Sequence, residues 1–208
     1  MRPTVVINLK TYKQGKDVVK IVNEVEKYDK NIIVGVQASD LSEMVKKTKL
    51  SVFIQHVDPF RPGRNTGYIT PESIKKLGVK GAFLNHSEHK LDFDVLKETV
   101  KRCNEVRLKT LIFASNLKEA IKIKTLKPDY LVIEPPELVA GDVSVSRAKP
   151  ELIENISKKL KYPFLVGAGI KTNEDVKIAL RLGAIGIAVS SAVTLSQNVN
   201  KTLKQLLG

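Results

Sequence analysis

Short runs of apolar residues alternate along this chain with longer stretches that have a helical period. Most of the runs contain Val, Ile, Leu or Phe without polar alternation, which is typical of strands buried on both faces. We expect eight such strands, at residues 4–9, 32–37, 52–55, 81–84, 110–114, 130–133, 164–166 and 186–190.

The stretches between the runs have the spacing of amphipathic helices. Over residues 18–25 apolar side chains recur at i, i+3, i+4 and i+7, and residues 96–103 and 176–180 follow the same spacing. The segments Thr70-Pro71-Glu72-Ser73 and Thr172-Asn173-Glu174-Asp175 have the composition of helix starts. Helices are therefore predicted between the strands.

Regular alternation of strand and helix implies right-handed crossovers and a parallel sheet. Eight units favour a closed (β/α)8 TIM barrel, and we expect a single domain that covers residues 1–208. The chain is short for this α/β fold, so the barrel must be compact. Because the second, fifth and seventh units look short, we expect some shortened outer helices.

Composition raises a second question, because the formal net charge is +13. Such a balance suggests a nucleic acid, an anionic membrane surface or a small anion as partner. The 35 basic residues are mostly Lys scattered over predicted helices, and aromatic residues make up only 5%. Arg and aromatic side chains are the usual means of reading nucleic acids. A solvated Lys-rich surface is the simpler interpretation, with polyanion binding as the alternative.

The chain contains one cysteine, Cys103, so neither an internal disulfide nor a Cys-rich zinc site is expected. No apolar run is long enough to cross a bilayer, and the N-terminal residues lack the apolar stretch of a secretory signal. We therefore expect a cytoplasmic protein without a metal or other cofactor.

Polar and small residues gather where the predicted strands end, which is where a barrel of this type carries its chemistry. They form the segments Asn8-Leu9-Lys10, Asn85-His86-Ser87-Glu88, Glu134-Pro135-Pro136, Gly167-Ala168-Gly169 and Ser190-Ser191. Each has an ordinary structural explanation on its own, such as a surface cation, a satisfied histidine or a tight turn. Together they supply a carboxylate, an imidazole, an ammonium and two loops whose backbone N–H groups could hold a phosphate.

With these residues in place, the chain resembles triosephosphate isomerase, specifically its short archaeal form. The resemblance runs from Asn8 to the helix after Ser191. It rests on the ordered motifs Gln55-His56-Val57-Asp58, Gly63-Arg64-Asn65-Thr66-Gly67, Asn85-His86-Ser87-Glu88, Glu134-Pro135-Pro136-Glu137-Leu138, Val145-Ser146-Arg147-Ala148-Lys149-Pro150-Glu151 and Val166-Gly167-Ala168-Gly169-Ile170.

The resemblance implies an aldose–ketose isomerase that interconverts dihydroxyacetone phosphate and glyceraldehyde 3-phosphate in glycolysis and gluconeogenesis. Glu134 would be the base that moves a proton between two carbons, and His86 would polarise the carbonyl. Lys10 would stabilise the enediolate with Asn8 beside it, and Glu88 would anchor the site by pairing with Lys10. Preorganised donors stabilise the charge that such an enediolate concentrates on oxygen.

The same resemblance implies where the substrate and a second subunit would bind. Asn8, Leu9 and Lys10 would contact the substrate, and residues 135–142 match a closing lid that brings Val139 to the phosphate. The remaining phosphate contacts would come from Gly169, Ser190 and Ser191. Thr66 would reach the active site of a neighbouring subunit in a homodimer or homotetramer.

The chain departs from the family pattern in three places. Asp142 adds a negative charge to the lid, and His89-Lys90 replaces a pair that more often contains Arg. Ala192 stands where the family usually has glycine, and alanine adopts positive φ less readily, so we expect strain there. Together the three departures predict a raised KM. Two other functions stay open: a different phosphate-binding barrel isomerase, such as those of amino-acid biosynthesis, or a non-catalytic polyanion-binding protein.

Overall fold

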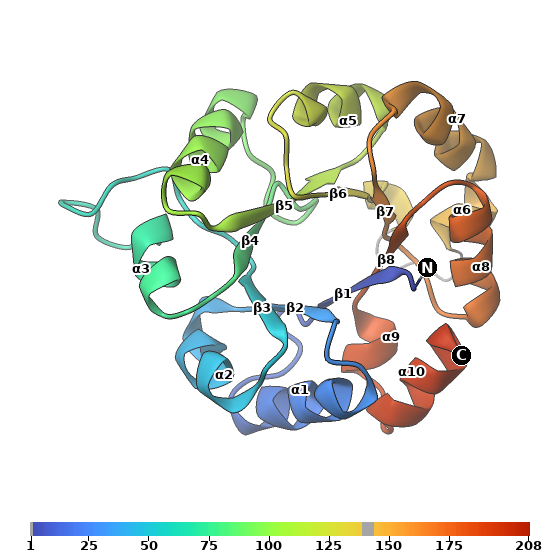
Figure 1. Cartoon of the computed structure of the whole chain (residues 1–208), viewed down its shortest axis with the longest axis horizontal. Coiled ribbons are helices and arrows are strands. Elements are labelled where there is room, and N and C mark those ends of the chain that lie inside the picture. The colour runs from blue at the N-terminus through green and yellow to red at the C-terminus, as the bar shows by residue number, and fades with distance from the viewer. Residues whose placement is uncertain (1, 139–143) are drawn as a thin grey trace.

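Eight parallel strands close into a barrel in the order β1 to β8, and helices form a ring around it (Figure 1). The computed structural model describes residues 2–138 and 144–208. The strands are β1 (Thr4–Asn8), β2 (Ile33–Val36), β3 (Ser51–Ile54), β4 (Gly81–Leu84), β5 (Lys109–Ala114), β6 (Tyr130–Ile133), β7 (Leu165–Val166) and β8 (Gly186–Val189). The predicted (β/α)8 barrel is confirmed, and each strand lies within one residue of its predicted bounds.

The helices differ widely in length. They are α1 (Lys16–Tyr28), α2 (Leu41–Lys47), α3 (Pro71–Lys76), α4 (Phe93–Glu105), α5 (Leu117–Lys124), α6 (Val145–Ala148), α7 (Pro150–Leu160), α8 (Asn173–Arg181), α9 (Ser191–Thr194) and α10 (Val199–Leu207), with 3-10 turns η1 (Ala38–Asp40) and η2 (Pro136–Leu138).

Shortened outer helices are present, but the prediction missed the third unit. Its helix α3 has six residues, fewer than α2, α5 or α8 in the units that looked short. The third unit instead places much of its length in residues 55–70, which include a loop that projects from the barrel between α3 and α4 (Figure 1).

Both predicted helix starts are confirmed by their hydrogen bonds. The Thr70 side chain accepts the backbone N–H of Ser73 ahead of α3. At α8 the Thr172 side chain accepts the N–H of Asp175, while the Asp175 side chain accepts the N–H of Thr172. The second arrangement satisfies two N–H groups that a helix start otherwise leaves without acceptors.

The hydrophobic core has two layers. The larger lies between the strands and the surrounding helices, and a smaller cluster fills the inside of the barrel with Phe53, Phe83 and other side chains. Glycine at two strand positions makes room for those rings. A Cβ added at Gly35 would lie 2.0 Å from Phe83, and one at Gly81 would lie 2.3 Å from Phe53. The filled interior supports the strand ends without providing a channel.

Candidate active site

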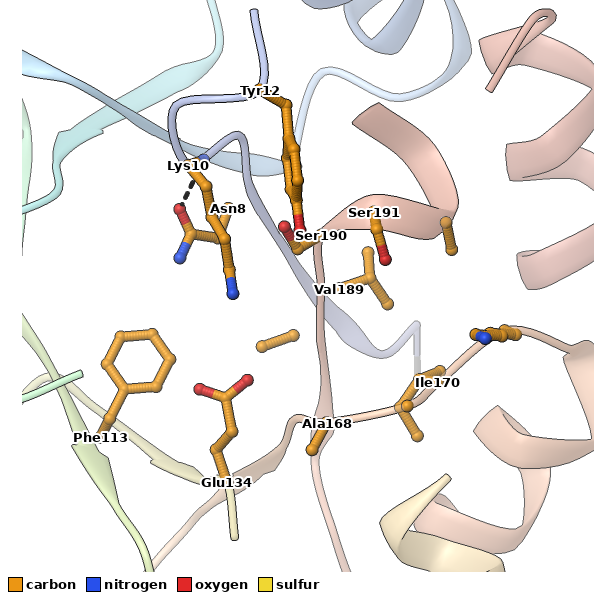
Figure 2. Close-up of a pocket in the computed structure, with 14 residues that line it drawn as sticks. Asn8, Lys10, Tyr12, Phe113, Glu134, Ala168, Ile170, Val189, Ser190 and Ser191 are labelled. Atoms are coloured by element: carbon orange, nitrogen blue, oxygen red, sulfur yellow. Dashed lines mark hydrogen bonds between the residues drawn. The ribbon is translucent and has the colours of Figure 1, made fainter. Parts of the chain in front are cut away.

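Side chains from four strand ends converge on one pocket at the carboxyl ends of the strands. Figure 2 shows Lys10, which follows β1, and Glu134, which follows β6, pointing toward one another from opposite sides of the pocket. The predicted residues that line it are Asn8, Lys10, Glu134, Gly169, Ser190 and Ser191. The sequence-predicted residues of the first, sixth, seventh and eighth units therefore meet in space.

Glu134 and His86 form the centre of the site. Glu134 follows β6 directly, and its residue is 9% exposed. Its Oε2 atom lies 3.1 Å from Nε2 of His86, which follows β4. The two atoms are close without the alignment of a hydrogen bond, so Oε2 has no hydrogen-bond donor in the described part of the chain. A buried carboxylate oxygen in this state is available to accept a proton from a bound molecule.

The surroundings of His86 define which ring nitrogen carries its hydrogen. Nδ1 accepts the backbone N–H of Glu88 at 3.1 Å, so the hydrogen of the neutral ring is on Nε2. The ring meets Phe113 edge to face, with the centroids 4.7 Å apart. Backbone and aromatic contacts together hold His86 with an N–H donor directed into the site.

Hydrogen bonds to both polar groups of its backbone hold Lys10 in place. The Lys10 N–H donates to Oδ1 of Asn8 at 3.0 Å, the bond drawn in Figure 2. Nε2 of Gln55 lies 3.2 Å from the same Asn8 oxygen, 3.0 Å from the Lys10 carbonyl and 3.2 Å from that of Gly35. These contacts join the ends of β1, β2 and β3.

The Lys10 ammonium forms an ion pair with Glu88. Nζ lies 2.6 Å from Oε1, and the Lys10 side chain is 12% exposed while that of Glu88 is 57% exposed. The expected pairing of these residues is thus present. Because Glu88 is largely solvated, the ion pair itself contributes little to stability, and its main effect is to orient the ammonium.

The loops after β7 and β8 line the pocket with small residues, which offer backbone N–H groups and hydroxyl groups. Ala168 and Gly169 have φ values of 74° and 67°, so two successive residues are left-handed. The Ser190 hydroxyl is buried and has no hydrogen-bond partner among the described residues. Helix α9 begins at Ser191, where the first N–H groups lack acceptors within the helix. This combination is suited to binding an anion.

Two of the described residues that were predicted for the site, Leu9 and Thr66, do not line either pocket that contains Lys10. Leu9 is 2% exposed and its side chain belongs to the core, so a role in substrate binding would fall to its backbone. Thr66 is exposed on the loop between β3 and α3. Val139 lies outside the described residues, as does Asp142.

The expectation of strain at Ala192 is wrong. Ala192 lies inside α9 and is not among the residues with positive φ. On this side of the pocket the left-handed residues are Ala168 and Gly169, in the loop between β7 and α8. An alanine within a helix is favourable, so this departure from the family pattern gives no reason to expect weaker binding.

Several residues of the site have no function predicted from the sequence. Gln55 belongs to one of the family motifs, and in the structure it links the ends of three strands. Tyr12 and Lys171 also line the pocket. Position after a strand is a signal that could have identified Gln55 and Lys171, whereas Phe113 contacts His86 from inside β5 and has no polar signal in the sequence.

Comparison with known proteins identifies the family. A family model described as "Triosephosphate isomerase" matches residues 3–114. The triosephosphate isomerase of Methanocaldococcus jannaschii is 35% identical over 98% of both chains. That of Thermoplasma volcanium is 39% identical over 98% of this chain and 99% of the relative. The chain belongs to the triosephosphate isomerase family.

A second family model, described as "Histidine biosynthesis protein", matches residues 137–208. This part of the chain contains β7, β8 and the loops that follow them. Lys10 and His86 lie instead in the segment matched by the triosephosphate isomerase model. The second likeness therefore concerns the last two strands of the barrel and the small-residue loops that follow them.

The described residues contain neither a cluster suited to a metal ion nor a helix suited to crossing a membrane. Among residues 2–138 and 144–208, no group of three or more His, Cys, Asp and Glu side chains is arranged to hold a metal ion. The same ranges contain no helix that is long and apolar enough to span a membrane.

Proposed function

We propose that this chain interconverts dihydroxyacetone phosphate and glyceraldehyde 3-phosphate, with Glu134 as the base and His86 as the electrophile. The observation that carries these assignments is the 3.1 Å approach of Glu134 Oε2 to His86 Nε2, with Oε2 otherwise lacking a donor in the described chain. Membership of the family supports the reaction, and the geometry supports the roles of the residues.

The proton moves between neighbouring carbons of the substrate in two steps. Glu134 removes a proton from the carbon next to the carbonyl, and the electron pair of that C–H bond forms the double bond of an enediolate. The displaced carbonyl pair stays on oxygen, where the Nε2–H of His86 and the Lys10 ammonium stabilise it. Protonated Glu134 then returns the proton to the second carbon. The hydroxyl proton of the first carbon moves to the oxygen of the second, so the carbonyl forms on the first carbon and the second carries the hydroxyl. This use of an acid residue and a neutral histidine is the mechanism described for triosephosphate isomerase itself.

The phosphate would bind across the pocket from Asn8. We assign this role to the N–H groups around Gly169 and Ser191 and to the hydroxyl of Ser190. That hydroxyl is buried without a partner in the described chain, a cost that a phosphate oxygen would remove. Lys10 contributes charge from the end of the neighbouring strand β1, because it lines the same pocket.

We also propose that the chain forms a homodimer or homotetramer, in which Thr66 reaches the active site of a neighbouring subunit. Thr66 is exposed on a projecting loop (Figure 1). The base of this loop is held by edge-to-face packing of Phe60 on Tyr68, whose centroids are 4.4 Å apart. Arg61 pairs with Glu105 of α4 at 2.8 Å. A loop anchored in this way can present its tip to another subunit.

The proposed reaction is tested by an isomerase assay coupled to a dehydrogenase that consumes the product. Glu134→Gln keeps the side-chain shape and removes the base, so kcat should fall at least roughly 10²-fold, the scale of general-base catalysis. Glu151→Gln, an exposed carboxylate change on α7, serves as the matched control and should leave kcat unaltered. Equal rates for wild type and Glu134→Gln would exclude the base assignment.

A further inference from the structure

Asp175 is a buried carboxylate that joins two segments beside the proposed phosphate pocket. It is 4% exposed and lies in the first turn of α8. Its Oδ1 atom accepts the Ser144 hydroxyl at 2.8 Å and lies 2.6 Å from Nε of Arg147. Its Oδ2 atom accepts the N–H of Lys171 at 3.1 Å and both the N–H and hydroxyl of Thr172 at 2.8 Å.

Asp175 makes more contacts than a helix cap needs. The capping box needs only Thr172 and Asp175, whereas Ser144 and Arg147 come from the segment that begins α6, about thirty residues earlier in the chain. The Ser146 hydroxyl also donates to the Asp175 carbonyl at 3.1 Å. The start of α6 is therefore bonded to the start of α8 through one residue.

The loop between β7 and α8 lies between these bonds. Val145 of α6 donates its N–H to the carbonyl of Ala168 at 3.2 Å, and Asp175 holds the N–H groups of Lys171 and Thr172 at the end of the loop. Helix α6 therefore holds the loop near its middle, and Asp175 holds the end of the loop that leads into α8. Asp175 also holds α6 in place.

This loop needs such support because of its backbone. Ala168 and Gly169 are both left-handed, and an alanine in this conformation is disfavoured by contact of its Cβ with the backbone. Disfavoured backbone persists only where the surrounding structure holds it. The two left-handed residues also direct the loop along the pocket that Gly169 lines.

Asp175 is ionised where an isomerase would be assayed. Burial opposes its charge, but hydrogen bonds from Thr172, Lys171 and Ser144 outweigh burial and hold the pKa of Asp175 below its ordinary value. A folded-state pKa below the unfolded one adds stability above the unfolded pKa, and this stability is lost as the pH falls through the folded pKa. The network is therefore intact near neutral pH.

We propose that Asp175 is a positioning residue for phosphate binding, which fixes the loop 167–171 through the N–H of Lys171 and through α6. This inference rests on the proposed function. Asp175 does not line the pocket, so it acts on phosphate only through the loop.

The test compares substrates with and without a phosphate group in Asp175→Asn. The amide of asparagine has one oxygen acceptor and one NH2 donor. Its NH2 group must therefore face other donors, either those of Ser144 and Arg147 or those of Lys171 and Thr172, and the bonds on that side are lost. We expect KM for glyceraldehyde 3-phosphate and the inhibition constant of inorganic phosphate to rise about tenfold, the scale of losing a charged hydrogen-bond acceptor. Because D-glyceraldehyde lacks phosphate, kcat/KM for it should stay within about twofold of the wild-type value.

The matched control is Glu174→Gln. Glu174 lies beside Asp175 in the same helical turn, and its carboxylate pairs with the exposed Arg181 at 2.6 Å. This variant makes the same change of charge without touching the loop, so its kinetic constants should equal those of the wild type.

The outcomes separate the two proposals. If the wild type does not isomerise triose phosphates, the proposed function fails, and this inference fails with it. If the wild type is active and Asp175→Asn leaves KM for glyceraldehyde 3-phosphate and the inhibition constant of phosphate unchanged, the positioning role alone is overturned. An equally large fall in kcat/KM for D-glyceraldehyde would overturn it too. Should Asp175→Asn fail to fold by circular dichroism, Ser144→Ala decides, because it removes one donor and keeps the helix cap. It should raise KM about threefold, and an unchanged KM would refute the inference.

Discussion

At the scale of single residues, three non-glycine residues at the strand ends of the proposed site have left-handed backbone. Lys10, Asn85 and Ala168 have φ values of 47°, 60° and 74°. Lys10 lies in the site, Asn85 precedes His86, and Ala168 precedes Gly169. Each non-glycine residue in this region costs about 1–2 kcal/mol, so the surrounding bonds must stabilise it.

Asn85 illustrates how that stabilisation is supplied. Its side chain donates to the Phe113 carbonyl at 2.9 Å and to Glu119 at 2.8 Å, and its Oδ1 accepts the N–H of Leu91. Every polar group of the amide faces a partner in neighbouring elements. The sequence predicted that Asn85 and His86 end a strand, but it could not reveal the bonds to Phe113 and Glu119, because these residues lie far away along the chain.

Two alanine positions should respond to glycine with opposite effects on stability. Ala168→Gly relieves a left-handed alanine and should leave the free energy of unfolding equal or raise it by up to about 1 kcal/mol. Ala192→Gly places glycine within helix α9 and should lower it by roughly 0.5–1 kcal/mol. Urea unfolding followed by circular dichroism measures both, and the order of the two variants is the decisive result. A larger loss in Ala168→Gly would show that the left-handed backbone is not strained.

At the scale of elements, the strands and helix starts were predictable because their signals are local. Apolar runs and capping residues depend on neighbours a few positions away, and the strands lie within one residue of their predicted bounds. The short helix α3 was not predicted, since its length depends on how many residues the preceding loop occupies. Links between elements, such as Gln55 across three strand ends, depend on tertiary packing and have no local signal.

The projecting loop is the element with the clearest expected effect on assembly. Thr66→Arg adds a long cation to the exposed part of this loop, and it should weaken self-association if the loop enters a neighbouring subunit. Sedimentation velocity over a concentration series should show a shift toward smaller species. Thr125→Arg adds the same charge after α5, at the other end of the barrel, and should leave the distribution unaltered. An unchanged profile for Thr66→Arg would count against the proposed contact.

At the scale of the whole molecule, the charge of +13 does not identify the chemistry. Several lysines pair with carboxylates one helical turn away, as in Lys27 with Glu24, Lys101 with Glu98 and Lys158 with Glu154. Exposed pairs of this type are those of a solvated surface. Membership of the isomerase family favours a small phosphate as the anionic partner. The excess charge would assist its approach chiefly at low salt, because ions screen surface charges.

The central claim is that Glu134 transfers the proton, and exchange with solvent tests it most directly. Dihydroxyacetone phosphate is incubated with enzyme in deuterated water, and deuterium bound to carbon is followed by nuclear magnetic resonance. A carboxylic acid formed at Glu134 exchanges its proton with water, so the wild type should incorporate deuterium, and Glu134→Gln should do so at least roughly 10²-fold more slowly. Incorporation at the wild-type rate in Glu134→Gln would contradict this account.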